Sequence, residues 1–237
     1  MTKTLETNRD WEDHWSSIVQ RLGRDDLIRQ AGRTIGGMPM PPRQTESTVE
    51  SVIQHLRLGP NDVLLDLCCG NGMVTVRLAR FCNFVVGVDY SLELIRLARE
   101  RHSLGNMAYL HRAVEDLRAD DFPMGKPTKV CMLTGLQYFT ERKLERLLQS
   151  LNVITRNKLR FYFGDVPDAG KIGAFYNTPE RWAEFEKRRA LGTEAIGTWW
   201  ERSHLISILE KAGHTAQIIE QESERCTGHY RFDVLAH

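Results

Sequence analysis

The chain of 237 residues carries 32 Lys and Arg against 31 Asp and Glu, a formal net charge of +1. This balance argues against the broad basic surface that nucleic-acid binding usually needs, so we expect no nucleic-acid partner. Hydrophobic residues make up 41% of the chain, no stretch approaches the roughly 20 apolar residues of a membrane helix, and the N-terminus is charged, so we expect no membrane partner and a cytoplasmic location.

The first 47 residues are expected to form a helical cap followed by a loop. Apolar residues recur at roughly helical spacing between residues 11 and 28, which predicts one or two amphipathic helices. Residues 32–42 are dense in Gly and Pro, which predicts a loop that either folds over a bound ligand as a lid or connects two elements. Thr45 or Ser47 can then cap a helix that runs through Leu56 and ends near Gly59 and Pro60.

From residue 48 onward, apolar runs of strand length alternate with helical patterns. Strands are expected at residues 63–67, 84–88, 107–110, 129–133, 159–163, 215–220 and 230–235. Helices are expected between them at residues 73–80, 92–101, 141–153 and 203–212. Such alternation is typical of a parallel α/β sheet covered on both faces, whereas the short polar connection before the last strand allows an antiparallel hairpin. A loop-rich insertion is expected at about residues 166–198.

The strongest local signal is the segment VLLDLCCGNG, residues 63–72, in which an apolar strand leads into Gly70-Asn-Gly72 and then a helix. A tight glycine turn lets a ligand approach the backbone and the N-terminus of the helix. Asp89 ends the next strand and can accept hydrogen bonds from both hydroxyls of a ribose. Asp66 at the end of the first strand would repel a pyrophosphate, so a nicotinamide or flavin cofactor fits less well than one that carries sulfonium and ammonium groups.

These residues resemble the class I S-adenosylmethionine-dependent methyltransferase family, in its small-molecule type, over about residues 48–237. The first motif of the family, acid-x-Gly-x-Gly-x-Gly, matches Asp66 to Gly72 with Cys68 in place of the first glycine. We therefore expect an ordinary backbone conformation at Cys68, with its side chain beside the methionine part of the cofactor. The resemblance implies a Rossmann-like, mostly parallel seven-stranded sheet with a C-terminal antiparallel hairpin and an N-terminal helical cap. It also implies S-adenosyl-L-methionine as the cofactor and methyl transfer as the activity.

The resemblance assigns the adenosine contacts to three further segments. Asp89 matches the ribose-binding acid of the family, and Tyr90 is expected to border the adenine. Ala113 stands where the family usually has an aspartate that contacts the adenine. The backbone of Val114 and the side chain of Glu115 are therefore expected to make that contact instead.

Thr134 and Gly135 follow the fourth strand and resemble the segment that lines the methyl donor and the entrance for the substrate. Nucleobase methyltransferases of this family carry Asn/Asp-Pro-Pro-aromatic or Pro-Cys at this place, and the chain carries neither. With the balanced net charge, this favours a small polar metabolite, such as a sugar or a natural-product intermediate, and oxygen over nitrogen as the acceptor. The alternatives are a non-catalytic partner subunit that binds the cofactor and, less favoured, a nicotinamide-dependent oxidoreductase. We expect a monomer or a homodimer.

Methylation of a hydroxyl needs a base, and the chain offers three candidates. Asp165 follows a predicted strand at the edge where α/β sheets bind ligands, although Gly-Asp-Val-Pro-Asp is also a turn sequence. His229 lies in the connection before the last strand and His14 in the N-terminal cap, where surface or packing roles are the alternatives. No group of side chains has the spacing of metal ligands, so no metal is expected, and the five cysteines are expected to be unpaired core residues.

Overall fold

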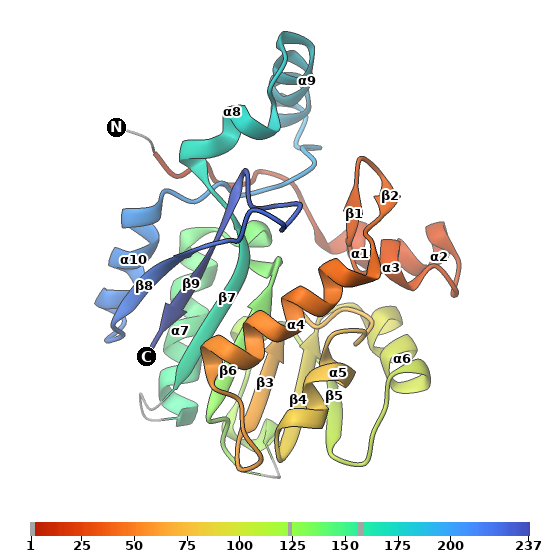
Figure 1. Ribbon diagram of the computed structural model, residues 1–237, viewed down its shortest axis with the longest axis vertical. Helices are drawn as coiled ribbons and strands as arrows, with labels where there is room; N and C mark the ends of the chain where they lie inside the picture. Colours follow the sequence, from red (N-terminus) through yellow and green to blue (C-terminus); the bar gives the residue numbers. More distant parts are fainter. Residues whose placement is uncertain (1–2, 123–124, 156–158) are drawn as a thin grey trace.

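A seven-stranded sheet organises the computed structural model, which describes residues 3–122, 125–155 and 159–237. The strands lie in the order β5-β4-β3-β6-β7-β9-β8 (Figure 1), and β9 runs antiparallel to both of its neighbours. Their bounds are β3 (Val63–Leu67), β4 (Phe84–Asp89), β5 (Met107–His111), β6 (Lys129–Leu133), β7 (Arg160–Pro167), β8 (Ala216–Glu220) and β9 (Arg231–Ala236). The predicted sheet, parallel except for its C-terminal hairpin, is confirmed.

Helices cover both faces of the sheet, which explains why its central strands are continuous apolar runs. One face carries α4 (Pro42–Leu56), α5 (Thr75–Leu78) and α6 (Leu92–Arg101), and the other carries α7 (Glu141–Thr155) and α10 (Arg202–Lys211) (Figure 1). Successive residues of β3 point to opposite faces: Leu64 packs in the cluster that contains Leu56 of α4, and Leu65 packs in the cluster that contains Leu147 of α7. The sheet therefore has a core on each side.

Two predicted helices have different bounds from those expected. Helix α4 begins at Pro42, so Thr45 and Ser47 lie inside the helix and the predicted cap at either residue is wrong. Proline suits the first helical position, because the N–H that it lacks would have no partner within the helix. The helix expected at residues 73–80 is confined to α5, which continues as the short 3-10 helix η1 (Ala79–Phe81).

The N-terminal segment folds into three short helices and a hairpin. These are α1 (Glu12–Ser16), α2 (Ile18–Leu22), α3 (Leu27–Gln30) and the two-residue strands β1 (Thr34–Ile35) and β2 (Met38–Pro39). Gly36 and Gly37 form the turn with φ of 56° and 81°, values that match the twist of a two-residue hairpin. The predicted loop therefore contains a hairpin, and Ile18 and Val19 of α2 pack against Leu94 and Leu97 of α6.

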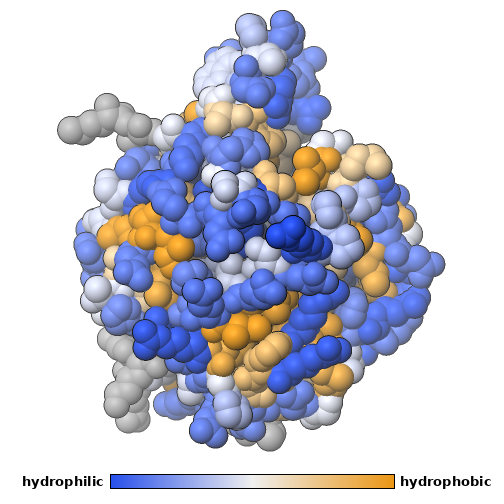
Figure 2. All heavy atoms as spheres, in the orientation of Figure 1, coloured by the Kyte–Doolittle hydropathy of each residue, from blue (hydrophilic) through white to orange (hydrophobic). Residues whose placement is uncertain are grey.

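The segment between β7 and α10 carries α8 (Ile172–Phe175) and α9 (Pro179–Ala190). These helices project from the end of the sheet in Figure 1, and Figure 2 shows a mostly hydrophilic surface over this projection. Phe175 anchors the segment, since its ring lies 4.6 Å from that of Tyr230 and 6.0 Å from that of Trp199. Among the helices that the structure describes, none is long and apolar enough to span a bilayer.

Candidate functional site

Two adjoining cavities lie at the carboxyl ends of the parallel strands. The first cavity has a volume of about 420 Å³ and the second of about 1050 Å³. Both are lined by Thr134 and Tyr138 at the end of β6 and by Arg9, Trp11 and Trp15 of the N-terminal segment. A molecule in the first cavity and a molecule in the second can therefore meet across this shared wall.

Left-handed backbone conformations mark the floor of both cavities. Cys68 follows β3 with φ of 57°, Thr134 follows β6 with φ of 56°, and Asp165 lies in β7 with φ of 60°. The expectation of an ordinary backbone at Cys68 is therefore wrong: the residue keeps a conformation suited to glycine, at a cost of about 1–2 kcal/mol. Cys68 lines the first cavity, Asp165 the second and Thr134 both. Such strain is concentrated where proteins hold ligands.

Asp89, at the end of β4, lines the first cavity and is 6% exposed. One of its carboxylate oxygens accepts a hydrogen bond from the Gly70 N–H at 2.9 Å, and the other accepts one from the Ser91 N–H at 2.9 Å. Burial raises the pKa of Asp89, and these backbone donors oppose that effect. Because each carboxylate oxygen has two lone pairs, both oxygens can still accept a hydrogen bond from a ligand.

The other residues assigned to the cofactor fall into two groups. Tyr90, Val114, Glu115 and Thr134 line the first cavity, and the Tyr90 hydroxyl donates to the Trp11 carbonyl at 2.8 Å, which ties the N-terminal segment to the end of β4.

Gly72 and Gly135 line neither cavity, and packing explains them instead. A Cβ atom at Gly72 would overlap the Tyr109 hydroxyl, and one at Gly135 would overlap the Met132 side chain. The missing side chains of Gly72 and Gly135 therefore allow close packing beside the first cavity, although neither residue lines that cavity.

The Asp66 carboxylate lies beneath the glycine turn and lines neither cavity. It accepts hydrogen bonds from the Thr75 hydroxyl at 2.6 Å and from the Cys131 thiol at 3.3 Å. Burial raises its pKa to about 6, against the hydrogen bonds that lower it. The side chain thus holds the turn to the helix that follows it.

The N-terminal segment supplies the cavity residues that the sequence did not indicate. Trp11 and Trp15 pack against Tyr138 in tilted and edge-on arrangements, with ring centroids 4.8 Å and 5.5 Å away, and Gln30 and Ala31 also line the first cavity. The two tryptophans have helical spacing, which predicts only an apolar face. The segment at residues 32–42, expected to form a loop that acts as a lid or as a connector, lines the second cavity through residues 32–37.

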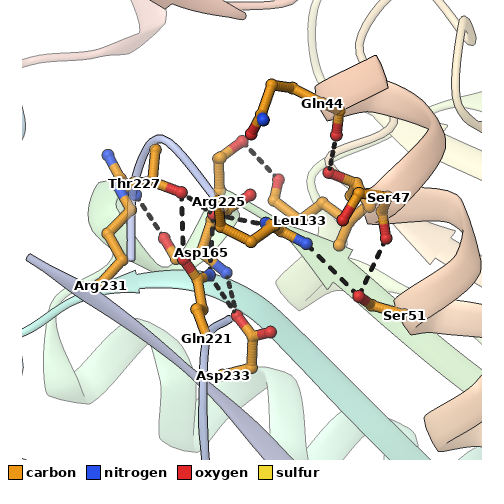
Figure 3. A network of polar contacts seen from close by, with 12 residues as sticks. Gln44, Ser47, Ser51, Leu133, Asp165, Gln221, Arg225, Thr227, Arg231 and Asp233 are labelled. Atoms are coloured by element: carbon orange, nitrogen blue, oxygen red, sulfur yellow. Dashed lines mark hydrogen bonds and ion pairs between the residues drawn. The ribbon is translucent and has the colours of Figure 1, made fainter. Parts of the chain in front are cut away.

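The sequence placed Asp165 after a strand, which is wrong, because β7 continues to Pro167. A bulge between Phe163 and Val166 turns the Asp165 side chain into the second cavity. Figure 3 shows its carboxylate among partners from the segment that leads into β9: it accepts hydrogen bonds from Arg225 at 3.1 Å, Thr227 at 2.8 Å and Gln221 at 2.9 Å.

This environment makes Asp165 a weak base. Burial acts to raise the pKa of Asp165, but Arg225, Arg231 and Arg33 together hold it well below its usual range. The carboxylate stays ionised and paired at neutral pH. The geometry therefore favours a structural role for Asp165 over proton transfer. The residue lies in a bulge of β7 and not in the turn that the local sequence indicated.

The two histidine candidates also line the second cavity, in different states. His14 Nδ1 accepts a hydrogen bond from Arg9 at 2.8 Å, because arginine has no acceptor atom. Burial, Arg9 and Arg21 lower the pKa of His14 to about 4, so its ring is neutral at pH 7 and Nε2 carries the proton. The His229 side chain is exposed, with its ring 4.8 Å from that of Tyr230.

The two cavities differ in the sign of their excess charge. Four carboxylates line the first cavity against two cationic side chains: Asp10, Glu12, Asp89 and Glu115 against Arg9 and Lys143. Seven arginines line the second cavity against the single carboxylate of Asp165. The near-neutral net charge of the chain conceals this separation.

Comparisons with known proteins agree with this geometry. A family described as a methyltransferase domain matches residues 64–158. An uncharacterized methyltransferase from Schizosaccharomyces pombe is 30% identical over 173 residues, which cover 70% of the chain and 58% of that protein. Residues 64–158 therefore match a methyltransferase-domain family, in agreement with the resemblance to class I S-adenosylmethionine-dependent methyltransferases. The chain spans less than two thirds of the length of this relative.

Solved structures share the fold of the chain. An S-adenosylmethionine-dependent methyltransferase from Anabaena variabilis superposes with a TM-score of 0.61 at 18% identity, over 100% of this chain and 96% of the other. A magnesium protoporphyrin IX methyltransferase from Synechocystis with bound S-adenosylhomocysteine (SAH) gives a TM-score of 0.60 at 17% identity, over 94% and 92% of the two chains. In the described part of the chain, no group of His, Cys, Asp or Glu side chains is arranged to hold a metal ion.

Proposed function

We propose that the protein binds S-adenosylmethionine in the first cavity and catalyses transfer of the methyl group to a small polar molecule in the second. The observation that carries this proposal is the shared wall: Thr134 and Tyr138 border both cavities, so a donor and an acceptor held on either side can meet there. Alignment of this kind supplies most of the rate enhancement in an in-line displacement.

The first cavity fits the cofactor in charge and in hydrogen-bonding groups. Its excess of carboxylates suits a ligand with sulfonium and ammonium groups and disfavours a pyrophosphate. The two free acceptor positions of Asp89 match the two hydroxyls of a ribose. Val114 and Glu115 border the adenine in this arrangement, while Cys68 and Thr134 lie beside the methionine part, and Asp66 contributes by holding the turn.

The bound cofactor supplies an electrophilic methyl group on sulfur, and the remaining chemistry falls to the side chains around it. We favour an oxygen acceptor, with His229 taking the proton, because His229 is the exposed base in the second cavity. Neutral His14 donates a hydrogen bond from Nε2 to the acceptor molecule. Trp11 and Trp15 exclude water from the shared wall, which protects the reacting atoms.

Titration calorimetry followed by a turnover assay tests this function. We expect the purified protein to bind SAH and S-adenosylmethionine but not NAD, and to transfer labelled methyl groups to members of a panel of small hydroxyl compounds. Binding without turnover on any panel would favour a non-catalytic partner subunit. Failure to bind either adenosyl ligand would reject the function.

A further inference from the structure

The inner wall of the second cavity contains buried arginines that have no counter-ion. Arg33 is 7% exposed and Arg231 is 5% exposed, and both line the cavity. Among the residues that the structure describes, no carboxylate oxygen lies within 4.0 Å of either guanidinium. Burying a charge without a partner is expensive, so the fold keeps these two residues at a cost in stability.

The neutral partners of these two arginines leave part of each side chain unused. Arg33 donates to the Thr48 hydroxyl at 3.3 Å, which engages one of its five N–H groups. Arg231 donates to the Gln137 side chain at 2.8 Å and to the Asp165 carbonyl, while its Nε has no partner. Burial lowers the pKa of Arg33, and Asp165 opposes that effect. Burial acts in the same direction on Arg231, but Tyr230 and Asp165 raise the pKa of that residue.

The charge on this wall is positive after internal pairing. Arg225 is also buried, and its ion pair with Asp165 at 3.1 Å uses the single carboxylate of the cavity (Figure 3). Three guanidinium groups against one carboxylate leave a charge of +2 on the wall. Asp233 lies behind Asp165 and outside the cavity, where it accepts hydrogen bonds from the Asp165 N–H and the Tyr162 hydroxyl and acts electrostatically on Arg225, while Arg33 and Arg231 face the cavity.

The outer arginines of the cavity differ from the inner ones. Arg29 pairs with Asp26 at 2.8 Å and Arg188 pairs with Glu184 at 2.6 Å, so their charges are already balanced at the surface. Arg181 donates to the Asn177 side chain at 3.0 Å on the projecting α9 segment. Arg9 donates to His14 and to the Glu194 carbonyl, and like Arg181 it has no ion pair among the described residues, but neither side chain is buried. Arg33 and Arg231 are therefore the buried arginines of the cavity that lack an ion pair.

We propose that Arg33 and Arg231 form the anchor for a doubly charged oxyanion of the substrate, either a phosphate-type group or a pair of carboxylates. This inference rests on the proposed function and names the substrate class of that site. The planar fork of a guanidinium matches such oxygens with two parallel hydrogen bonds.

The anchor also determines how the substrate is oriented. Arg231 holds Gln137, which belongs to the turn η4 (Gly135–Tyr138) that follows Thr134 in the shared wall. An oxyanion bound at Arg231 therefore leaves the other end of the molecule beside Thr134 and Tyr138. The acceptor oxygen of the substrate is separate from its anchoring group in this arrangement.

The test uses calorimetry of the SAH-loaded protein at low ionic strength, with inorganic phosphate and malonate as probes. We expect Arg33→Gln to weaken binding of the preferred probe about tenfold or more, since a hydrogen-bonded charged contact is lost. Arg29→Gln is the matched control from the same cavity, and its change is expected to stay within about twofold because its ion pair is exposed. Arg231→Lys keeps the charge, loses the fork and should also weaken binding.

Each result decides the question. Tighter binding of phosphate supports a phosphorylated substrate, and tighter binding of malonate supports a dicarboxylate, provided that Arg33→Gln weakens either one. If neither probe binds, or if Arg33→Gln and Arg231→Lys both bind as the wild type does, the anchor is refuted while SAH binding still stands. Loss of SAH binding in the wild type would instead reject the proposed function. Arg33→Gln removes a charge that has no ion pair, so we expect this variant to remain folded. Its melting temperature checks this expectation.

Discussion

Replacement of Asp89 by asparagine isolates the charge that we assign to the ribose hydroxyls. Hydrogen bonds to charged groups contribute about 1.5–3 kcal/mol each, against about 1 kcal/mol for neutral ones. The amide side chain of the Asp89→Asn variant would retain one acceptor oxygen, so one charged hydrogen bond is lost and the other becomes neutral. The expected loss is about 2–3 kcal/mol, which weakens SAH binding about 30- to 150-fold.

The same change also affects the protein without ligand. The carboxylate of Asp89 accepts from the Gly70 and Ser91 N–H groups on its two oxygens. An amide leaves one of these donors facing its NH₂ group, so we expect the free energy of unfolding to fall by about 1–2 kcal/mol.

Calorimetry with SAH, run at a temperature where the variant is folded, measures the effect. Asp116→Asn is the matched control, because Asp116 pairs with Arg146 at the surface and does not line the first cavity. If Asp89→Asn binds SAH as tightly as Asp116→Asn does, the assignment of Asp89 to the ribose is wrong.

Three further predictions follow from the same structure. Gly72→Ala forces a Cβ atom onto the Tyr109 hydroxyl, whereas the new Cβ atom in Gly70→Ala meets no atom within 4 Å. Thermal melting should therefore show a larger loss of stability for Gly72→Ala, by about 2 kcal/mol or more. Equal losses of stability in the two variants would contradict the packing argument. The folded pKa of His14, about 4, lies below its ordinary value of 6.5, so its contribution to stability is complete above pH 6.5 and is lost as the pH falls toward 4. Urea unfolding at pH 7 and pH 5 should therefore show a smaller pH dependence for His14→Gln than for the wild type, and an equal one would refute the shift. Asparagine tolerates the left-handed backbone at position 165, but Asp165→Asn breaks the buried ion pair with Arg225. The free energy of unfolding should therefore fall by about 3 kcal/mol. A variant as stable as the wild type would show that the ion pair contributes nothing to stability.

The sheet and the cofactor side of the site follow from local sequence signals. A strand buried on both faces is an apolar run wherever it occurs, and this property located β3, β4 and β6. The glycine turn and Asp89 are linked by a fixed spacing in sequence, so they could be placed together. Cys68 shows the limit of this approach, because the identity of a residue does not reveal that the fold imposes a left-handed conformation on it.

The second cavity could not be predicted in the same way. Its arginines are spread from Arg9 to Arg231, and each one alone is typical of a solvated surface. Only the folded chain brings them together and buries three of them. The bulge at Asp165 was missed for a related reason: it depends on the register with β9, where the Asp233 partner of its N–H lies 68 residues away in the chain.

The wall between the cavities joins two binding equilibria through one set of side chains. The main-chain carbonyl of Trp11 accepts a hydrogen bond from the Tyr90 hydroxyl, its indole packs on Tyr138, and the residue lines both cavities. If a nucleoside on one side favours one placement of this indole, a molecule on the other side experiences a changed surface. Thermodynamic reciprocity then requires that each ligand alter the dissociation constant of its neighbour by the same factor.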